Sequence, residues 1–164
     1  RMINKSEPSL IRTEADELTY CLHIMVRYEL EKRMFDGSLT AHDLPAEWNR
    51  LYKEYLGIDV PDDRQGVLQD SHWANGNIGY FPSYAIGSAY GAQYLQEMSK
   101  DLDVDAVVRS GDLTPINNWL EDRIWKHGCM KDPVALFESV CGKFDPDCYV
   151  AYLEKKFTEV YGLS

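Results

Sequence analysis

The residues best suited to chemistry gather between Gly66 and Tyr94, in the segment GVLQDSHWANGNIGYFPSYAIGSAYGAQY. Hydrogen-bonding side chains alternate there with glycines, which let the backbone approach another group closely. The polar and aromatic candidates are Gln69, Asp70, His72, Trp73, Tyr80 and Tyr84. This combination predicts the wall of a site, with Trp73 and Phe81 better suited to packing.

A second set of candidates precedes Gly37. The run LIRTEADELTYCLHIMVRYELEKRMF, residues 10–35, has no Gly or Pro and predicts one helix of about seven turns. At about 100° per residue, one stripe of this helix collects an acid, a phenol, an imidazole and guanidiniums. Its members are Arg12, Asp16, Tyr20, His23, Arg27 and Glu31. Composition favours a solvated face with ion pairs of about 0.3–0.5 kcal/mol each, and a polar cleft is the alternative.

The remaining pattern supplies helices to hold these residues. We expect an irregular loop over 66–81, a helix from Pro82 to Leu102, and an earlier helix from Leu44 or Pro45 to Leu56 that Gly57 ends. Three further helices are each opened by Pro after a capping residue and closed by Gly. They run from Thr114-Pro115 to Gly128, from Asp132-Pro133 to Gly142 and from Asp145-Pro146 to Gly162.

No strand-like alternation longer than a few residues interrupts this pattern. The sequence therefore predicts an all-α fold, with five or six helices around one core in a single domain over residues 1–164.

Charge and hydropathy narrow the class of partner. The net charge of −10 and the absence of a basic patch argue against nucleic-acid binding. No apolar run approaches the roughly 20 residues of a membrane span, and the first residues have no signal-peptide core. We therefore expect a cytoplasmic protein without a membrane or nucleic-acid partner.

The common catalytic motifs are absent. The four histidines are followed by Ile24, Asp43, Trp73 and Gly128, so there is no His-Glu-x-x-His metal site. There is also no GxSxG elbow, no phosphate-binding loop with Lys and no dinucleotide fingerprint. The residues alone indicate a helical domain with one polar, site-like loop.

Two stretches identify a family. IRTEADELTYCLHI, residues 11–24, and GVLQDSHWANGNIGYFPSYAIG, residues 66–87, resemble the IRxxADExxYxxHI and GxxQDxHWxxGxxGYFPxYxxG segments of the thermostable carboxypeptidase Taq family of metallocarboxypeptidases. DLPAEWNRLYKEYLGI and FTEVYGL are similar too. The resemblance covers essentially this whole chain but only the C-terminal third of a family member.

This resemblance implies the C-terminal part of a larger, mostly helical, cytosolic and usually dimeric enzyme. Such an enzyme uses zinc or cobalt to remove C-terminal residues from peptides. The metal ligands and the general base would lie in a catalytic segment upstream of Arg1. We therefore expect no metal bound by this chain alone, and we expect the isolated chain to be inactive.

The resemblance also suggests roles for individual residues. Arg12 would capture the terminal carboxylate of the peptide substrate, and His72 with Tyr80 or Tyr84 would donate to the developing oxyanion. Asp16 and Glu17 would orient an arginine or a histidine from behind the site, where His23 is also placed. Gln69 and Asp70 would assist substrate binding or, as an alternative, cap the loop backbone.

Two rival hypotheses belong to other functional classes. The chain could be a stand-alone helical module that binds a peptide or a partner without cleaving it, or a purely structural helical domain. An exposed apolar face, onto which a missing segment would dock, is expected for the enzyme fragment.

Overall fold

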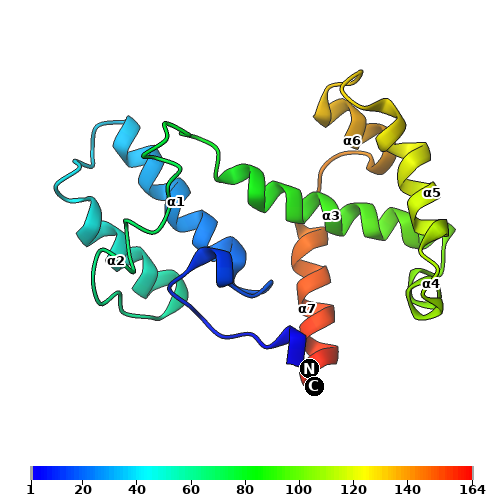
Figure 1. Ribbon diagram of the computed structural model, residues 1–164, viewed down its shortest axis with the longest axis horizontal. Coiled ribbons are helices and arrows are strands. Elements are labelled where there is room, and N and C mark those ends of the chain that lie inside the picture. Colours follow the sequence, from blue (N-terminus) through cyan, green and yellow to red (C-terminus); the bar gives the residue numbers. More distant parts are fainter. Residues whose placement is uncertain (1, 164) are drawn as a thin grey trace. The chain divides into compact units, whose positions relative to one another are not determined.

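The computed structural model describes residues 2–163, and its regular elements are all helical (Figure 1). They are η1 (Met2–Asn4), η2 (Arg12–Glu14), α1 (Tyr20–Phe35), α2 (Leu44–Leu56), α3 (Pro82–Asp101), α4 (Val104–Ser110), α5 (Thr114–Arg123), η3 (Trp125–His127), α6 (Pro133–Cys141) and α7 (Asp147–Tyr161). The all-α prediction is confirmed. Within these residues no helix has both the length and the apolar character needed to cross a membrane.

The described chain divides into two compact units. The first runs as far as Ile86 and includes Val160–Gly162, and the second consists mainly of Gly87–Glu159. Every site residue predicted from the sequence belongs to the first unit. The expectation of a single domain stays a prediction.

The predicted helix over residues 10–35 is wrong at its start, because α1 begins only at Tyr20. Before it, Arg12–Glu14 forms one 3₁₀ turn and Ala15 is extended, with φ −65° and ψ 142°. Asp16 explains the late start, since a carboxylate that bonds nearby backbone N–H groups competes with the helix. It accepts hydrogen bonds from the backbone of Glu7, Leu18 and Thr19 and from the hydroxyls of Ser6 and Thr19.

α1 buries polar side chains and exposes apolar ones. His23 and Arg27 are completely buried and Glu31 nearly so, whereas Met25 and Tyr28 are almost half exposed. The interpretation of the charged stripe as a solvated face is therefore wrong. Because buried charges must be paired, the stripe needs partners inside the unit.

α2 packs against α1. Trp48, Leu51, Tyr52 and Leu56 are buried on one face, while Val26 and Leu30 face them from α1. The Trp48 and Tyr52 rings stack with centroids 5.0 Å apart. Gly57 ends α2 in the left-handed conformation, at φ 73°, and its N–H bonds Lys53 O.

The loop over 66–81 is irregular and α3 begins at Pro82, both as predicted. Gly66 is where the loop folds back on itself, because a Cβ built there would lie 2.8 Å from Val60 Cγ1 and 3.1 Å from Asp62 O. A larger residue at this position would push away the segment that contains Val60 and Asp62.

The second unit is organised around α3. Tyr90 stacks on Phe137 of α6 at 3.9 Å, and buried Gln93 donates to Lys143 O and accepts from Asp145 N. The predicted helix from Asp132-Pro133 is confirmed as α6, with the Asp132 carboxylate capping two backbone N–H groups. α7 agrees with the third predicted helix, but it starts at Asp147, one residue after Pro146.

Two details of the second unit differ from the prediction. α5 ends at Arg123 rather than near Gly128, because Ile124 leaves the helical region (φ −127°, ψ −64°) and a separate 3₁₀ turn follows. The short helix α4, capped by the Asp103 carboxylate, was not predicted. It brings the α-helices among the described residues to seven, where five or six were expected.

Candidate functional site

Three buried charged side chains meet where η2, α1 and the 66–81 loop come together. Arg12 donates from Nε and Nη2 to Asp70 Oδ1, at 3.0 and 2.8 Å, and Arg27 donates from Nε and Nη2 to Asp70 Oδ2. The side chains of Arg12, Asp70 and Arg27 are 9%, 7% and 0% exposed. Two guanidiniums against one carboxylate leave this Arg12–Asp70–Arg27 cluster with one excess positive charge.

The surroundings keep Asp70 ionised. Burial alone would raise the pKa of its carboxyl, but the charge of Arg27 and the hydrogen bonds from both arginines outweigh burial and hold that pKa below its usual value. The pKa of Arg12 is raised: burial acts to lower it, and the hydrogen bond and charge of Asp70 more than offset that effect. The ion pairs therefore persist across neutral pH.

Aromatic rings cover the two guanidiniums. Arg12 Cζ lies 5.6 Å from the ring centroid of Phe81 and 5.1 Å from that of Tyr84. Arg27 Cζ lies 4.6 Å from Trp48 and 5.4 Å from Phe81. Ring faces attract cations, by about 2 kcal/mol where water is excluded, so these contacts help to hold the excess positive charge.

His72 joins the cluster to the tyrosines. Its Nε2 is 3.0 Å from the Tyr84 hydroxyl, while its buried Nδ1 lies 3.8 Å from Asp70 Oδ1, too far for a hydrogen bond. The carboxylate favours the tautomer with the proton on Nδ1, in which Nε2 accepts from Tyr84. Tyr80 lies over the His72 ring at 5.9 Å and is half exposed.

His23 lies behind the cluster. Its Nδ1 is 3.1 Å from the hydroxyl of Tyr52, which itself donates to Leu10 O at 3.2 Å, so Nδ1 is the donor in the first contact. Burial, followed by the charges of Arg27 and Arg12, lowers the pKa of His23 to about 4. His23 is therefore a neutral, buried part of the wall.

Glu31 attaches the polar loop to α1. Its carboxylate accepts from Trp73 Nε1 at 2.8 Å and from Gly79 N at 3.2 Å. Neither Glu31 nor Arg27 was assigned a site role from the sequence, although both belong to the predicted stripe. Their i, i+4 spacing with His23 was the available signal.

The structure brings some of the predicted site residues together and places others apart. Arg12, Asp70, His72 and Tyr84 form one contact network. Gln69 is exposed and its amide bonds Arg64 O within the loop. Asp16 bonds the segments before and after it, and Glu17 is partly buried beside it.

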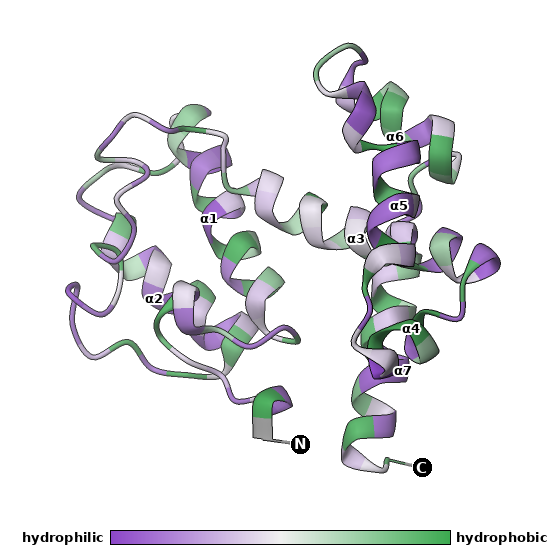
Figure 2. Ribbon diagram, turned by 45° about the vertical axis from the view of Figure 1, so that its right-hand side comes forward, coloured by the Kyte–Doolittle hydropathy of each residue, from purple (hydrophilic) through white to green (hydrophobic). Residues whose placement is uncertain are grey.

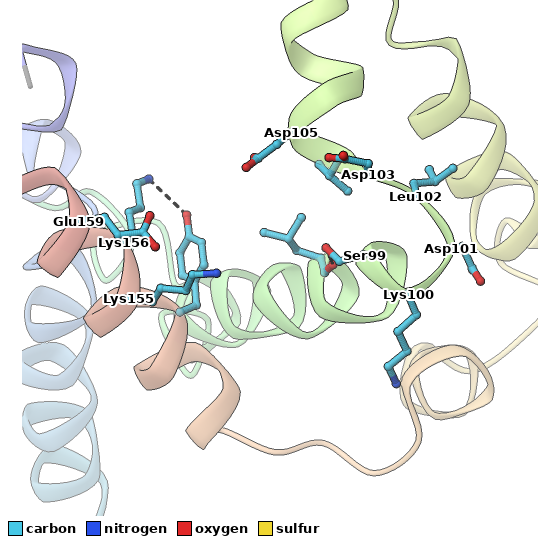
Figure 3. Close-up of a pocket in the computed structure, with 12 residues that line it drawn as sticks. Ser99, Lys100, Asp101, Leu102, Asp103, Asp105, Lys155, Lys156 and Glu159 are labelled. Atoms are coloured by element: carbon cyan, nitrogen blue, oxygen red, sulfur yellow. Dashed lines mark hydrogen bonds between the residues drawn. The ribbon is translucent and has the colours of Figure 1, made fainter.

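A separate cavity of about 760 Å³ lies in the second unit, between the C-terminal half of α3, the start of α4 and α7 (Figure 3). Acidic side chains of Asp103 and Asp105 form one wall, and Lys155 and Lys156 form another. None of the site residues predicted from the sequence lines this cavity. It therefore adds nothing to the site in the first unit.

Metal-binding residues are a distinct question. In the described part of the chain, no group of three or more His, Cys, Asp or Glu side chains is placed to hold a metal ion. Asp70, the carboxylate nearest His72, is already bonded to two arginines. These residues do not fit a zinc or cobalt site.

Comparison with known proteins decides the family. A model of the carboxypeptidase Taq (M32) metallopeptidases matches residues 1–157. The chain belongs to this family. The resemblance seen in residues 11–24 and 66–87 is thereby confirmed, and M32 enzymes are metallopeptidases by description.

Relatives of known sequence or structure agree with this assignment. Carboxypeptidase 1 of Bacillus subtilis is 45% identical over 163 residues, and thermostable carboxypeptidase 1 of Thermus thermophilus is 44% identical; 98% of this chain is covered in each case. The M32 carboxypeptidase from Deinococcus radiodurans matches with a TM-score of 0.95 at 37% identity, covering 99% of this chain. The chain spans about a third of these relatives, 32% of the two sequences and 33% of the solved structure.

The buried histidine yields a prediction about acid stability. The unfolded chain binds a proton on His23 near pH 6.5, whereas the folded chain does so only near pH 4. The stability contributed by neutral His23 is thus complete above pH 6.5 and is lost as the pH falls to about 4. It amounts to about 3 kcal/mol.

We therefore expect the free energy of unfolding to fall less between pH 7 and pH 4 in His23→Gln than in the wild type. Urea unfolding at pH 7, 5.5 and 4 measures this fall. His42→Gln, at an exposed histidine, is the control and should follow the wild type. Parallel curves for His23→Gln and the wild type would show that His23 is not buried as a neutral group.

Proposed function

We propose that this chain is the C-terminal, substrate-binding portion of an M32 metallocarboxypeptidase that releases C-terminal amino acids from peptides. The Arg12–Asp70–Arg27 cluster carries this proposal, because it holds one excess positive charge in a largely buried position beside His72 and Tyr84. A peptide's terminal carboxylate has the charge and the planar geometry that such a group favours.

Arg12 has donors left for a substrate. Of the five N–H groups of a guanidinium, two are bonded to Asp70 and one to the Tyr20 hydroxyl. One N–H remains on Nη1 and one on Nη2. This pair forms the fork that bonds both oxygens of a carboxylate.

The neighbouring groups suit the next position of a bound peptide. The scissile carbonyl lies one residue away from the terminal carboxylate, and the His72–Tyr84 pair lies next to Arg12. On substrate binding, the Tyr84 hydroxyl would turn from His72 Nε2 to that carbonyl and donate to the developing oxyanion, which would stabilise it. Tyr80 flanks the same ring, and exposed Gln69 would contact the peptide at the rim.

The metal and the general base would come from elsewhere in the complete enzyme. Because the described residues offer no metal-binding group, we propose that an upstream catalytic segment supplies the zinc or cobalt site and that this chain is inactive without it. A homodimer is proposed for the complete enzyme.

The outward face of α1 is the proposed docking surface for that segment. Its exposed apolar residues recur at intervals of seven and three, which keeps them on one face: Leu18 just before the helix, then Met25, Tyr28 and Phe35. Figure 2 shows hydrophobic and hydrophilic residues interspersed along α1. Since the opposite face is buried within the first unit, only this face is left for a further segment.

We predict that the isolated chain binds a dye specific for apolar surface and self-associates at high concentration, because this face lacks its cover. Replacing Met25 and Phe35 with Gln should reduce both effects, while replacing Glu29 with Gln, on the same helix, should not. Dye fluorescence and light scattering measure the two effects. A clean monomer without dye binding would contradict the proposal.

A chimaera tests the proposed activity. This chain would replace the matching third of Bacillus subtilis carboxypeptidase 1, and release of C-terminal residues from a short peptide would be measured with zinc or cobalt. We expect cleavage by the chimaera and none by this chain alone. Arg12→Ala should raise KM by about 30- to 100-fold, because a charge-assisted contact to the carboxylate is lost.

The control is Arg33→Ala, which removes a more exposed arginine of α1 that pairs with Glu47 and should leave KM unchanged. A folded, metal-loaded chimaera that binds the peptide without cleaving it would favour the stand-alone binding module. An unchanged KM in Arg12→Ala would contradict the substrate role of Arg12.

A further inference from the structure

We infer that Arg27 is a positioning residue that sets the orientation of Arg12 through Asp70. This inference rests on the proposed function, in which Arg12 binds the substrate carboxylate. Arg27 itself is fully buried and would not touch the substrate.

The two arginines are held very differently by the backbone. Arg12 lies in a single 3₁₀ turn between Ile11 and Ala15, both of which are extended. Arg27 lies in the middle of α1, where its Nη1 donates to His23 O at 2.6 Å and its guanidinium covers the Trp48 ring. Arg27 is therefore the fixed partner and Arg12 the adjustable one.

Asp70 transmits this difference because its two oxygens are divided between the arginines. Among the described residues, Oδ2 accepts from Arg27 alone, and Oδ1 accepts both bonds from Arg12. Because Arg27 holds Oδ2, the carboxylate has less freedom to move, and the place where Oδ1 holds Arg12 is restricted with it. The same oxygen lies 3.8 Å from His72 Nδ1, so the imidazole is aligned from the same point.

Positioning and charge make opposite predictions. If Arg27 contributed only its positive charge, Arg27→Lys would bind substrate normally, and Asp70→Asn would bind it more tightly because the cluster becomes more positive. If Arg27 orients Arg12 through the contacts of its Nε and Nη2 with Asp70 Oδ2, a lysine, which has a single ammonium nitrogen, cannot replace it. Breaking the link at Asp70 would then weaken binding despite the added positive charge.

The test measures kcat and KM in the chimaera for Arg27→Lys, Asp70→Asn and Arg12→Ala, and for the double variant Arg27→Lys/Arg12→Ala. We expect Arg27→Lys and Asp70→Asn each to raise KM about tenfold or more, as loss of a supporting contact behind a site commonly does. No further rise is expected when Arg27→Lys is added to Arg12→Ala. Leu30→Ala, at a buried site on the same helix, is the control for lost stability and should leave KM unchanged.

Normal KM in Arg27→Lys, or tighter binding in Asp70→Asn, would overturn the inference, as would full additivity in the double variant. Asp70→Asn keeps the test decisive if Arg27→Lys does not fold. Failure of the proposed function is recognised separately, because Arg12→Ala alone would then leave KM unchanged.

Discussion

The first unit depends on one electrostatic constraint: two guanidiniums withdrawn from water share a single carboxylate. Removing one partner of a buried ion pair costs about 3–5 kcal/mol, because the other charge is left uncompensated. Asp70 must therefore stay beside α1, and the 66–81 loop is held there with it. Glu31 adds a second attachment through Trp73 and Gly79. The 66–81 loop, which contributes Asp70 and His72 to the site, is therefore fixed to α1 by these two sets of contacts.

Much of the fold could be predicted because its signals are local. Gly57 and Gly142 end helices at positive φ, and Pro82 and Pro133 stand at the first helical positions. The start of α1 could not be predicted in the same way. Asp16 bonds to Ser6 and Glu7, ten and nine residues away, and a periodicity argument does not include such contacts.

The buried face of α1 could not be predicted from hydropathy. Hydropathy places charged residues outward, yet Arg27 and Glu31 point inward because the loop supplies Asp70, Trp73 and Gly79 as partners. Meanwhile Met25 and Tyr28 are left at the surface. Spacing along one helix cannot show that Arg27 and Glu31 have hydrogen-bonding partners 42 to 48 residues further along the chain. The family, by contrast, was recognisable from residues 11–24 and 66–87, where the site residues are concentrated.

The most direct test of this account follows the Arg12 and Arg27 Nε–H resonances by NMR while the purified chain is titrated with a blocked dipeptide. Two forms are compared, one with a free C-terminal carboxylate and one with a C-terminal amide. The account predicts that the Arg12 resonance shifts with the carboxylate form alone, while buried Arg27 shifts little. An equal response to both forms, or no response of Arg12 to either, would contradict the claim that this cluster reads the end of a peptide.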